Sequence, residues 1–508
     1  PITHPAAGSL HERRSFQAAC RTQPITASIM PFLSIEFALF FLLFLPLYWL
    51  CRPSPRLQNL LQLAAGLGWL VYIAPLAALA LAAFSLAVSL LAQLLTRSRS
   101  TAARRWWLGT GVVLALANLV FFKFSDFFRP LLQQHSGSTL PDILMPLGIS
   151  YYTFQGIAYL VALYRGESPR LGTLQQLLHF GFFPTITSGP IIRAAAFKGS
   201  GGRLEAGMAE QICTAAPRDM VKPALAVSLI VLGIAKKWWL AGTLGESWVD
   251  PVFENPLQYD APSVLAAVYG YTVQLFMDFS GYSDLVIGMA MLLGFRLPEN
   301  FNMPLRAYNI RDFWDRWHIT LSTWIRDYIY IPLGGSRHGF TRTQINLMLA
   351  MLLSGIWHGQ GWNFLLWGAL HGAALVLLNI GDKIGGRREI LAASRIARLI
   401  GILFTLHFVC FSFVVFRTAS LSDAALVFQS LAGQGAGWRM PELPVAALLV
   451  LFAAALAAYG LLARVFRCAA AALEKLPVWL WWLPLTAAMV LLMVLAPSGI
   501  PGFIYANF

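Results

Sequence analysis

Long apolar runs recur from one end of the chain to the other, with short polar segments between them. Runs of about 20 apolar residues have the length that a helix needs to cross the hydrocarbon core of a bilayer. The period-2 alternation typical of membrane β-strands is absent. The pattern therefore predicts an all-α, polytopic membrane protein. Helical spans are expected at 32–50, 57–73, 75–95, 106–122, 143–163, 224–242, 262–278, 282–295, 345–357, 361–379, 397–416, 442–463 and 478–497.

Some of the predicted elements do not fit a complete crossing. Runs 282–295 and 345–357 are short enough to be half-spans, and 180–192 contains Pro and Gly and is predicted to be re-entrant. Irregular backbone is tolerated at membrane depth where protein or a wet cavity surrounds it. In 311–330, aromatic residues recur at helical spacing among many charged residues. That segment is predicted to be one amphipathic helix in the membrane plane.

Residues 1–29 differ from the rest of the chain. They are polar, contain several arginines and lack the continuous apolar core of a secretory signal. The clear apolar run after Met30 suggests that Met30 is the physiological start. The expected organisation is a disordered upstream extension at 1–29, followed by one transmembrane domain at 30–508.

Composition and charge support the membrane assignment. The chain is 57% hydrophobic and 12% charged, whereas soluble domains carry roughly 25% charged residues. The net charge of +14 comes from short basic clusters between apolar runs, as in cytoplasmic loops. Basic tracts interleaved with aromatic residues are absent, so nucleic acid is not an expected partner and the lipid bilayer is. The clusters are Arg52/Arg56, Arg97/Arg99/Arg104/Arg105 and Arg387/Arg388/Arg395/Arg398.

His358 is the first candidate for chemistry, because it lies between the apolar runs 345–356 and 362–378. A titratable side chain at membrane depth is costly and is a functional-site hypothesis by default. Imidazole is the usual general base near neutral pH, and a low dielectric favours its neutral form. The flanking glycines allow close approach of a ligand or of another helix. The alternative is a packing histidine that forms a hydrogen bond across the helix bundle.

His318 lies 40 residues before His358, in the predicted in-plane helix. Together with His371 these histidines raise the question of zinc, which needs three or four protein ligands at suitable geometry. No HExxH motif or carboxylate partner accompanies them, and the five cysteines show no CxxC spacing. On one helix, His358 and His371 would point to roughly opposite sides. No metal site is predicted, and no cofactor-binding residue is identified.

Segment 277–284 places two carboxylates, Asp278 and Asp284, in an apolar neighbourhood. Buried carboxylates need partners, and the arginines of 311–326 are candidates. Gly281 is expected to break the helix here. A structural network that holds the amphipathic helix and a catalytic role both remain open for this segment.

Several longer motifs occur in order along the chain, and together they resemble the membrane-bound O-acyltransferase (MBOAT) family. The resemblance is to its bacterial branch of alginate O-acetylases and peptidoglycan O-acetyltransferases, and it extends from Met30 to Phe508. Small departures at 360–363 and 412–417 concern substrate detail. The motifs are 145–155 (MPLGISYYTFQ), 184–193 (PTITSGPIIR), 278–284 (DFSGYSD), 297–302 (LPENFN), 312–321 (DFWDRWHITL), 323–335 (TWIRDYIYIPLGG) and 355–359 (GIWHG).

The resemblance carries expectations about fold and site. The fold would be a ring of tilted transmembrane helices around a central funnel and tunnel, with in-plane and re-entrant helices. His358 matches the family's catalytic histidine and would act as general base on an attacking hydroxyl. His318 matches the second motif position and would orient the donor or stabilise the tetrahedral oxyanion, which is worth about 3–4 kcal/mol. A transiently acetylated histidine is the alternative chemistry.

The resemblance also implies a function. The chain would be an O-acetyltransferase of the bacterial cytoplasmic (inner) membrane, without a permanently bound cofactor. It would move acetyl groups from a cytoplasmic donor, acetyl-CoA, toward hydroxyls of an extracytoplasmic polysaccharide such as alginate. A periplasmic SGNH-hydrolase-like acetyltransferase is the expected partner in that transfer. Peptidoglycan, cellulose and other exopolysaccharides are alternative acceptors, and a non-enzymatic acetyl-transporting or scaffold subunit is the alternative class.

Overall fold

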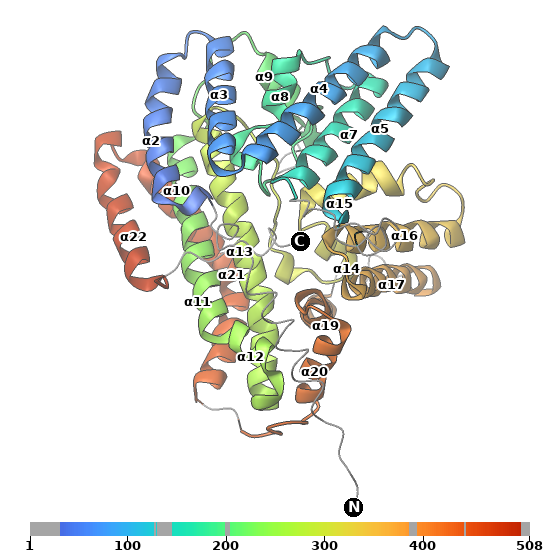
Figure 1. The fold of residues 1–508 in the computed structure, drawn as a ribbon. Coiled ribbons are helices and arrows are strands. Elements are labelled where there is room, and N and C mark those ends of the chain that lie inside the picture. The colour runs from blue at the N-terminus through green and yellow to red at the C-terminus, as the bar shows by residue number, and fades with distance from the viewer. Residues whose placement is uncertain are drawn as a thin grey trace, which may run out of the picture.

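Helices make up nearly all of the regular structure in the computed structural model, which describes residues 31–125, 129, 145–198, 204–385, 394–440 and 443–498 (Figure 1). The predicted extension at 1–29 and the start at Met30 lie outside these residues. Eight of the described helices are long and apolar enough to cross a membrane. The expected all-α, polytopic fold class is confirmed. The eight are Pro75–Arg97, Thr101–Lys123, Pro223–Glu254, Ala261–Leu292, Trp362–Gly385, Arg395–Arg417, Leu443–Lys475 and Val478–Leu495.

The first part of the chain forms the helices at the top of Figure 1. Serine side chains begin three of them: Ser34, Ser54 and Ser100 each accept a hydrogen bond from the backbone N–H three residues later. A short antiparallel hairpin pairs β1 (Phe197–Lys198) with β2 (Leu204–Glu205). The helices are α2 (Ile35–Leu50), α3 (Pro55–Ile73), α4 (Pro75–Arg97), α5 (Thr101–Lys123), α7 (Ile149–Arg165), α8 (Thr173–Phe180) and α9 (Met208–Cys213).

The second part forms a column of helices, and a pair of helices lies beside this column, directed away from it (Figure 1). The column contains α10 (Pro223–Ile234), α11 (Gly242–Leu244), α12 (Asp250–Glu254), α13 (Ala261–Leu292) and α21 (Leu443–Lys475), with π-helical turns at Ala235–Ala241 and Gly245–Val249. The pair beside the column is α16 (Phe340–His358) and α17 (Trp362–Gly385). The others are α14 (Ile310–Trp314), α15 (Ile319–Ile325), α19 (Arg395–Arg417), α20 (Leu421–Leu431) and α22 (Trp482–Leu495).

The long helix α13 corrects the expected break at Gly281. The helix continues through this residue, so the predicted spans 262–278 and 282–295 are parts of one helix. Gly281 instead allows close packing, since a Cβ there would lie 2.8 Å from the Gly233 carbonyl oxygen on α10. A Cβ on Gly233 would lie 2.5 Å from the Gly281 carbonyl oxygen. Small residues thus bring the two helices into backbone contact, as is common between membrane helices.

The carboxylates of α13 find their partners on the helix that it packs against. Lys237 forms an ion pair with Asp278, and the Lys236 Nζ lies 2.6 Å from Asp284 Oδ2. Both lysines belong to the π-helical turn that follows α10. The arginines of 311–326, which the sequence suggested as partners, are therefore the wrong candidates. Nothing in the local sequence indicated that the lysines of this π-helical turn would contact α13.

Segment 311–330 is broken into pieces and is not the single helix that was expected. α14 ends at Trp314, α15 begins at Ile319, and a π-helical turn occupies Arg326–Tyr330. His318 lies at the break in the left-handed region, with φ 44° and ψ 53°. A non-glycine residue in this conformation is uncommon and marks a place where surrounding contacts hold the backbone. The aromatic residues do recur at helical spacing in the sequence, but this spacing did not indicate the break at His318.

The segment predicted to be re-entrant, 180–192, is buried along its whole length. It contains a 3₁₀ turn at Phe183–Thr185. The irregular backbone of segment 180–192 is therefore enclosed by protein, as the membrane environment requires.

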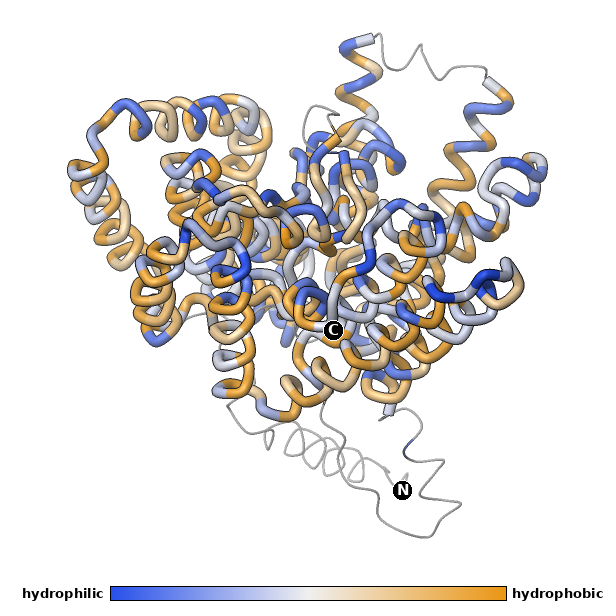
Figure 2. Tube along the Cα trace, turned by 90° about the horizontal axis from the view of Figure 1, so that it is seen from above, coloured by the Kyte–Doolittle hydropathy of each residue, from blue (hydrophilic) through white to orange (hydrophobic). Residues whose placement is uncertain are grey.

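Further short 3₁₀ turns lie at Pro31–Leu33, Pro256–Gln258, Pro304–Arg306 and Val478–Leu480. Figure 2 shows hydrophobic residues along most helices and hydrophilic residues mainly at helix ends and connections.

Candidate active site

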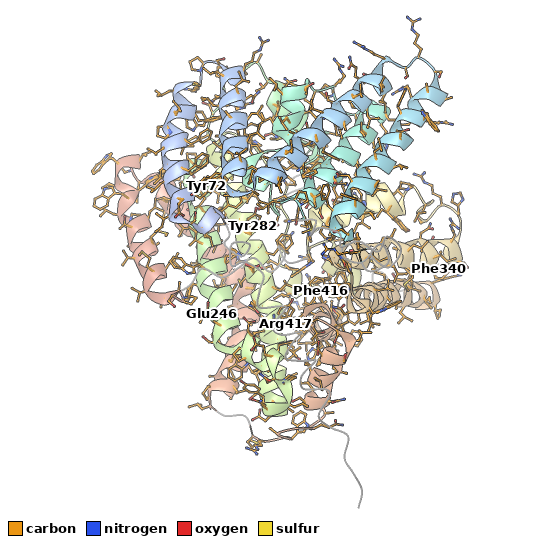
Figure 3. The ribbon with its side chains drawn as sticks, viewed as in Figure 1. Tyr72, Glu246, Tyr282, Phe340, Phe416 and Arg417 are labelled. Atoms are coloured by element: carbon orange, nitrogen blue, oxygen red, sulfur yellow. The ribbon has the colours of Figure 1, made fainter. Side chains whose placement is uncertain are left out.

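His358 is the last residue of α16 and has an exposed fraction of 2%. Its imidazole lies edge-on to the Trp367 ring, with centroids 5.2 Å apart, and edge-on to the Phe416 ring, at 5.1 Å. Phe416 comes from the end of α19, near the centre of Figure 3. The predicted polar group at membrane depth is thus placed in an aromatic enclosure built by three helices.

The glycines near His358 serve helix packing. A Cβ on Gly355 would lie 2.3 Å from the Phe364 carbonyl oxygen, and one on Gly359 would lie 2.2 Å from the Phe364 ring. α16 and α17 can therefore approach to backbone contact. Of the two readings of these glycines, close approach of another helix is the one observed.

His318 is 1% exposed and faces a different part of the same region. Its imidazole lies edge-on to the Phe279 ring of α13, with centroids 4.7 Å apart. Its Nδ1 lies 3.2 Å from the side-chain oxygen of Asn300, which belongs to the 297–302 motif. Burial lowers the pKa of His318 to about 3, so the imidazole is neutral at physiological pH.

The Trp357 indole brings the two histidines into one site. Its centroid lies 6.5 Å from that of His318 and 4.6 Å from that of His358. The two imidazole centroids are therefore no farther apart than the sum of these two distances, about 11 Å, although the residues are 40 positions apart in the sequence. A substrate that spans such a distance can contact both rings. The structure thus brings together the two residues that the sequence singled out.

His371 packs against the Trp367 ring, which also contacts His358. Its ring centroid lies 4.7 Å from that of Trp367, and its Nε2 lies 3.0 Å from the Ser412 hydroxyl. His371 is on α17 and His358 ends α16, so the expectation that one helix carries both on opposite sides does not apply. Among the described residues, no group of three or more His, Cys, Asp or Glu side chains is arranged to hold a metal ion.

Lys123 is a neighbour of the site that the sequence did not point to. Its ammonium lies 4.9 Å from the Trp357 ring centroid, a cation–π contact, and its carbonyl oxygen accepts a hydrogen bond of 2.6 Å from the Gln360 side chain. The residue is 7% exposed although it ends an apolar helix, α5. A lone lysine at the end of an apolar run is usually interpreted as an interfacial anchor. Only the tertiary structure shows that Lys123 contacts Trp357.

Comparison with known proteins places the site in a family. A model of MBOAT, the membrane-bound O-acyltransferase family, matches residues 62–422, which include His318, Trp357 and His358. A probable alginate O-acetylase of Pseudomonas aeruginosa is 36% identical over 354 residues, covering 68% of this chain and 63% of that protein. A second one, of Azotobacter vinelandii, is 35% identical over 376 residues, covering 72% and 70%.

A peptidoglycan O-acetyltransferase of Helicobacter pylori is also similar, with 30% identity over 374 residues that cover 66% of each chain. The alignment with the Pseudomonas aeruginosa protein spans less than two thirds of that protein's length. The matched part of the present chain nevertheless contains the whole site, from Lys123 to Phe416. The chain belongs to the membrane-bound O-acyltransferase family.

Proposed function

We propose that the chain is a membrane O-acetyltransferase that moves acetyl groups from cytoplasmic acetyl-CoA toward hydroxyls of an extracytoplasmic polysaccharide, with alginate as the first candidate. The similarity to alginate O-acetylases and to a peptidoglycan O-acetyltransferase supports both the acetyl group and the acceptor class. A teichoic acid D-alanyltransferase of Bacillus subtilis, 30% identical over 286 residues, is named for a different acyl group. The experiment described below therefore also tests which acyl group the protein transfers.

One observation carries this proposal: His318 and His358 converge on the Trp357 indole inside a membrane protein. Burying two imidazoles in an apolar enclosure is costly when they serve packing alone, because each leaves polar ring nitrogens to be satisfied. A reaction that needs a proton acceptor shielded from water would explain why the fold buries two imidazoles in spite of this cost. Such a reaction is acyl transfer from a thioester to a hydroxyl.

His358 takes the proton of the attacking hydroxyl as the hydroxyl oxygen forms a bond to the acetyl carbonyl carbon. The carbon–sulfur bond of the thioester then breaks, and the proton passes from the imidazolium to the departing thiolate, giving an ester and free CoA thiol. A general base contributes about 10²–10⁴-fold to such a step. A transient acetyl-imidazole is the alternative route for the same overall balance.

The location and partner belong to the same proposal. We place the protein in the bacterial inner membrane, so that donor and acceptor approach from opposite faces. A periplasmic SGNH-hydrolase-like acetyltransferase would receive the acetyl group and complete its transfer to the polymer. In that arrangement the hydroxyl that His358 deprotonates, and that attacks the acetyl carbonyl carbon, belongs either to the polysaccharide or to the partner's own nucleophile.

The experiment uses the full chain in lipid nanodiscs supplied with acetyl-CoA and uronate oligosaccharides. We expect release of CoA thiol and acetylation of the sugar, both lost in His358→Ala. A matched control is His179→Ala, because His179 is equally buried on α8 and has no ring contact with Trp357 among the described residues. The same assay with alanyl thioester tests the acyl group.

Each result bears on a specific part of the proposal. Retention of more than about half of the activity in His358→Ala, with normal membrane insertion, would overturn the catalytic assignment. Acetyl movement across the membrane without thiol release that depends on an acceptor would identify a transporter. A requirement for the chain in polymer acetylation without any use of acetyl-CoA would identify a scaffold subunit. Acetylation of peptidoglycan fragments or cellulose oligomers in place of uronates would change the polymer and keep the enzyme class.

A further inference from the structure

Asn300 forms hydrogen bonds with segment 318–320 through both its backbone and its side chain. Its carbonyl oxygen accepts a hydrogen bond of 2.9 Å from the Ile319 N–H. Its side-chain Oδ1 lies 3.2 Å from the Thr320 backbone nitrogen, 2.8 Å from the Thr320 hydroxyl and 3.2 Å from His318 Nδ1. Asn300 is 1% exposed, so these contacts are shielded from water.

The orientation of the Asn300 amide follows from the chemistry of these partners. The backbone N–H of Thr320 can only donate, so the atom that faces it must be the amide oxygen. The Thr320 hydroxyl is also free to donate to this oxygen, because its own lone pair receives the Ile191 N–H at 3.1 Å. Two donors of known polarity therefore identify Oδ1, which resolves the usual ambiguity of an amide.

The same oxygen then determines the proton position on His318. An amide oxygen accepts and cannot donate, so the ring nitrogen that faces it, Nδ1, must carry the hydrogen. A neutral imidazole carries one ring hydrogen, so the other nitrogen, Nε2, is an acceptor. In histidine sites generally, the partner of one nitrogen sets what the other nitrogen can do.

We infer that Asn300 is a positioning residue that holds His318 in the Nδ1–H tautomer, so that Nε2 meets the substrate as a hydrogen-bond acceptor. This inference rests on the proposed function for the presence of a substrate at His318. The resemblance left two roles open for His318, and the first, orienting the donor, is compatible with this tautomer when Nε2 accepts a hydrogen bond from an N–H or O–H group of the donor. Donating to a tetrahedral oxyanion from neutral Nε2 is not.

The backbone at His318 adds a reason for a dedicated partner. The residue has φ 44°, and it begins α15 without capping that helix through its own side chain. Asn300 supplies the missing acceptor for the first turn from 18 residues upstream, through the Thr320 N–H. One side chain therefore stabilises the turn and orients the ring that the turn presents.

The experiment reads the tautomer directly. Full-length protein with ¹⁵N-labelled histidine is measured by NMR in detergent, and His318→Gln identifies the His318 signals by their loss. The proton on Cδ2 couples to Nε2 and distinguishes the two nitrogens. We expect Nδ1–H in the wild type and in Asn300→Asp, which keeps an acceptor. Asn300→Leu removes the acceptor, so Nε2–H should appear.

Activity provides an independent readout. Losing the partner that orients a metal-binding histidine costs about 10-fold to 100-fold in affinity or activity, and we expect a loss of similar size in Asn300→Leu. In Asn300→Asp the new carboxylate favours the imidazolium, so the acid limb of the pH–rate profile should move to higher pH. Thr320→Val is the structural control, since it removes a hydrogen bond to the same Oδ1 and should leave the tautomer unchanged.

The outcomes separate this inference from the proposed function. A wild-type spectrum with Nε2–H on His318 would overturn the inference, and so would an unchanged Nδ1–H signal in Asn300→Leu. The wild-type spectrum decides even if Asn300→Leu does not fold. Full acetyl transfer by His318→Gln would remove His318 from the proposed function and would leave the tautomer result standing.

Discussion

His318 and Trp357 lie 39 residues apart in the sequence, yet their rings meet with centroids 6.5 Å apart and planes inclined at 61°. Trp357 precedes His358 directly, so this contact sets the distance between the two histidines. The same indole receives the Lys123 ammonium and lies 5.5 Å from the Phe154 ring. Trp357 of α16 is thus the common neighbour of α5, α7 and the turn before α15.

Replacing Trp357 should therefore disturb the reaction more than the protein as a whole. We expect Trp357→Ala to lower acetyl transfer about 100-fold, because small displacements of reacting groups can cost that much. Trp357→Phe keeps a ring in place and should retain more activity. Trp106→Ala is the control, since Trp106 is 70% exposed on α5. Equal activity in Trp357→Ala and the wild type would show that the contact does not position the histidines.

Breaking the Lys237–Asp278 ion pair should destabilise the fold. Both side chains are almost fully buried, at 1% and 2% exposure, so Asp278→Ala leaves an uncompensated charge and should cost about 3–5 kcal/mol. The double variant Lys237→Met/Asp278→Leu removes both charges and should recover much of this loss. Thermal unfolding in detergent, followed by fluorescence, measures the change.

An exposed ion pair provides the comparison for that experiment. Arg52 and Asp219 lie 2.5 Å apart with side chains 56% and 76% exposed, so Asp219→Ala should change the free energy of unfolding by less than about 1 kcal/mol. If Asp278→Ala proved as mild as Asp219→Ala, the buried pair would not be a structural element of the α10–α13 contact.

A methyl group at Gly281 should separate α10 from α13. The new Cβ would lie 2.8 Å from a backbone oxygen that cannot move independently, and overpacking of this kind costs about 1–3 kcal/mol. Gly68→Ala is the matched control, because a Cβ there meets nothing within 4 Å in helix α3. That control should be neutral or stabilising by up to about 1 kcal/mol. Equal unfolding temperatures for the two variants would argue against backbone contact at Gly281.

The basic cluster Arg52/Arg56 predicts the orientation of the first span. These residues follow α2 directly, within the range where positive charge sets topology, so they should face the cytoplasm. In a cysteine-free background, Ser54→Cys should resist a membrane-impermeant thiol reagent added from the periplasmic side. Removing Cys51 first is essential, because it lies three residues away and is partly exposed. Efficient labelling from the periplasm would reverse the orientation.

Much of the architecture could be predicted because membrane helices are encoded locally. Each apolar run long enough for the bilayer appears as a helix near its expected place, as α4 and α19 do. Serine caps and prolines mark several helix starts within a few residues. The two histidines could also be singled out locally, because a polar ring in an apolar run is unusual whatever surrounds it.

Contacts between helices could not be read in the same way. Gly281 looked like a helix breaker, since a glycine that opens the backbone and a glycine that lets another helix approach have the same local sequence. The partners of Asp278 and Asp284 came from consecutive lysines on a π-helical turn that follows α10, and the local sequence did not indicate that this turn lies against α13. His318 likewise has a left-handed backbone conformation at a place where Asn300, 18 residues earlier, forms hydrogen bonds with its ring and with the Thr320 N–H.

Residue type and apolar length thus established the membrane class, the approximate helices and the two histidines to examine. The convergence of His318 and His358 on Trp357 and the proton position on His318 were decided by the assembled fold. The physical reason is that hydrophobic burial has no direction and acts along each run, whereas hydrogen bonds and ring contacts require particular atoms to meet within a few ångströms. Those atoms come from segments up to hundreds of residues apart, which helix packing brings together.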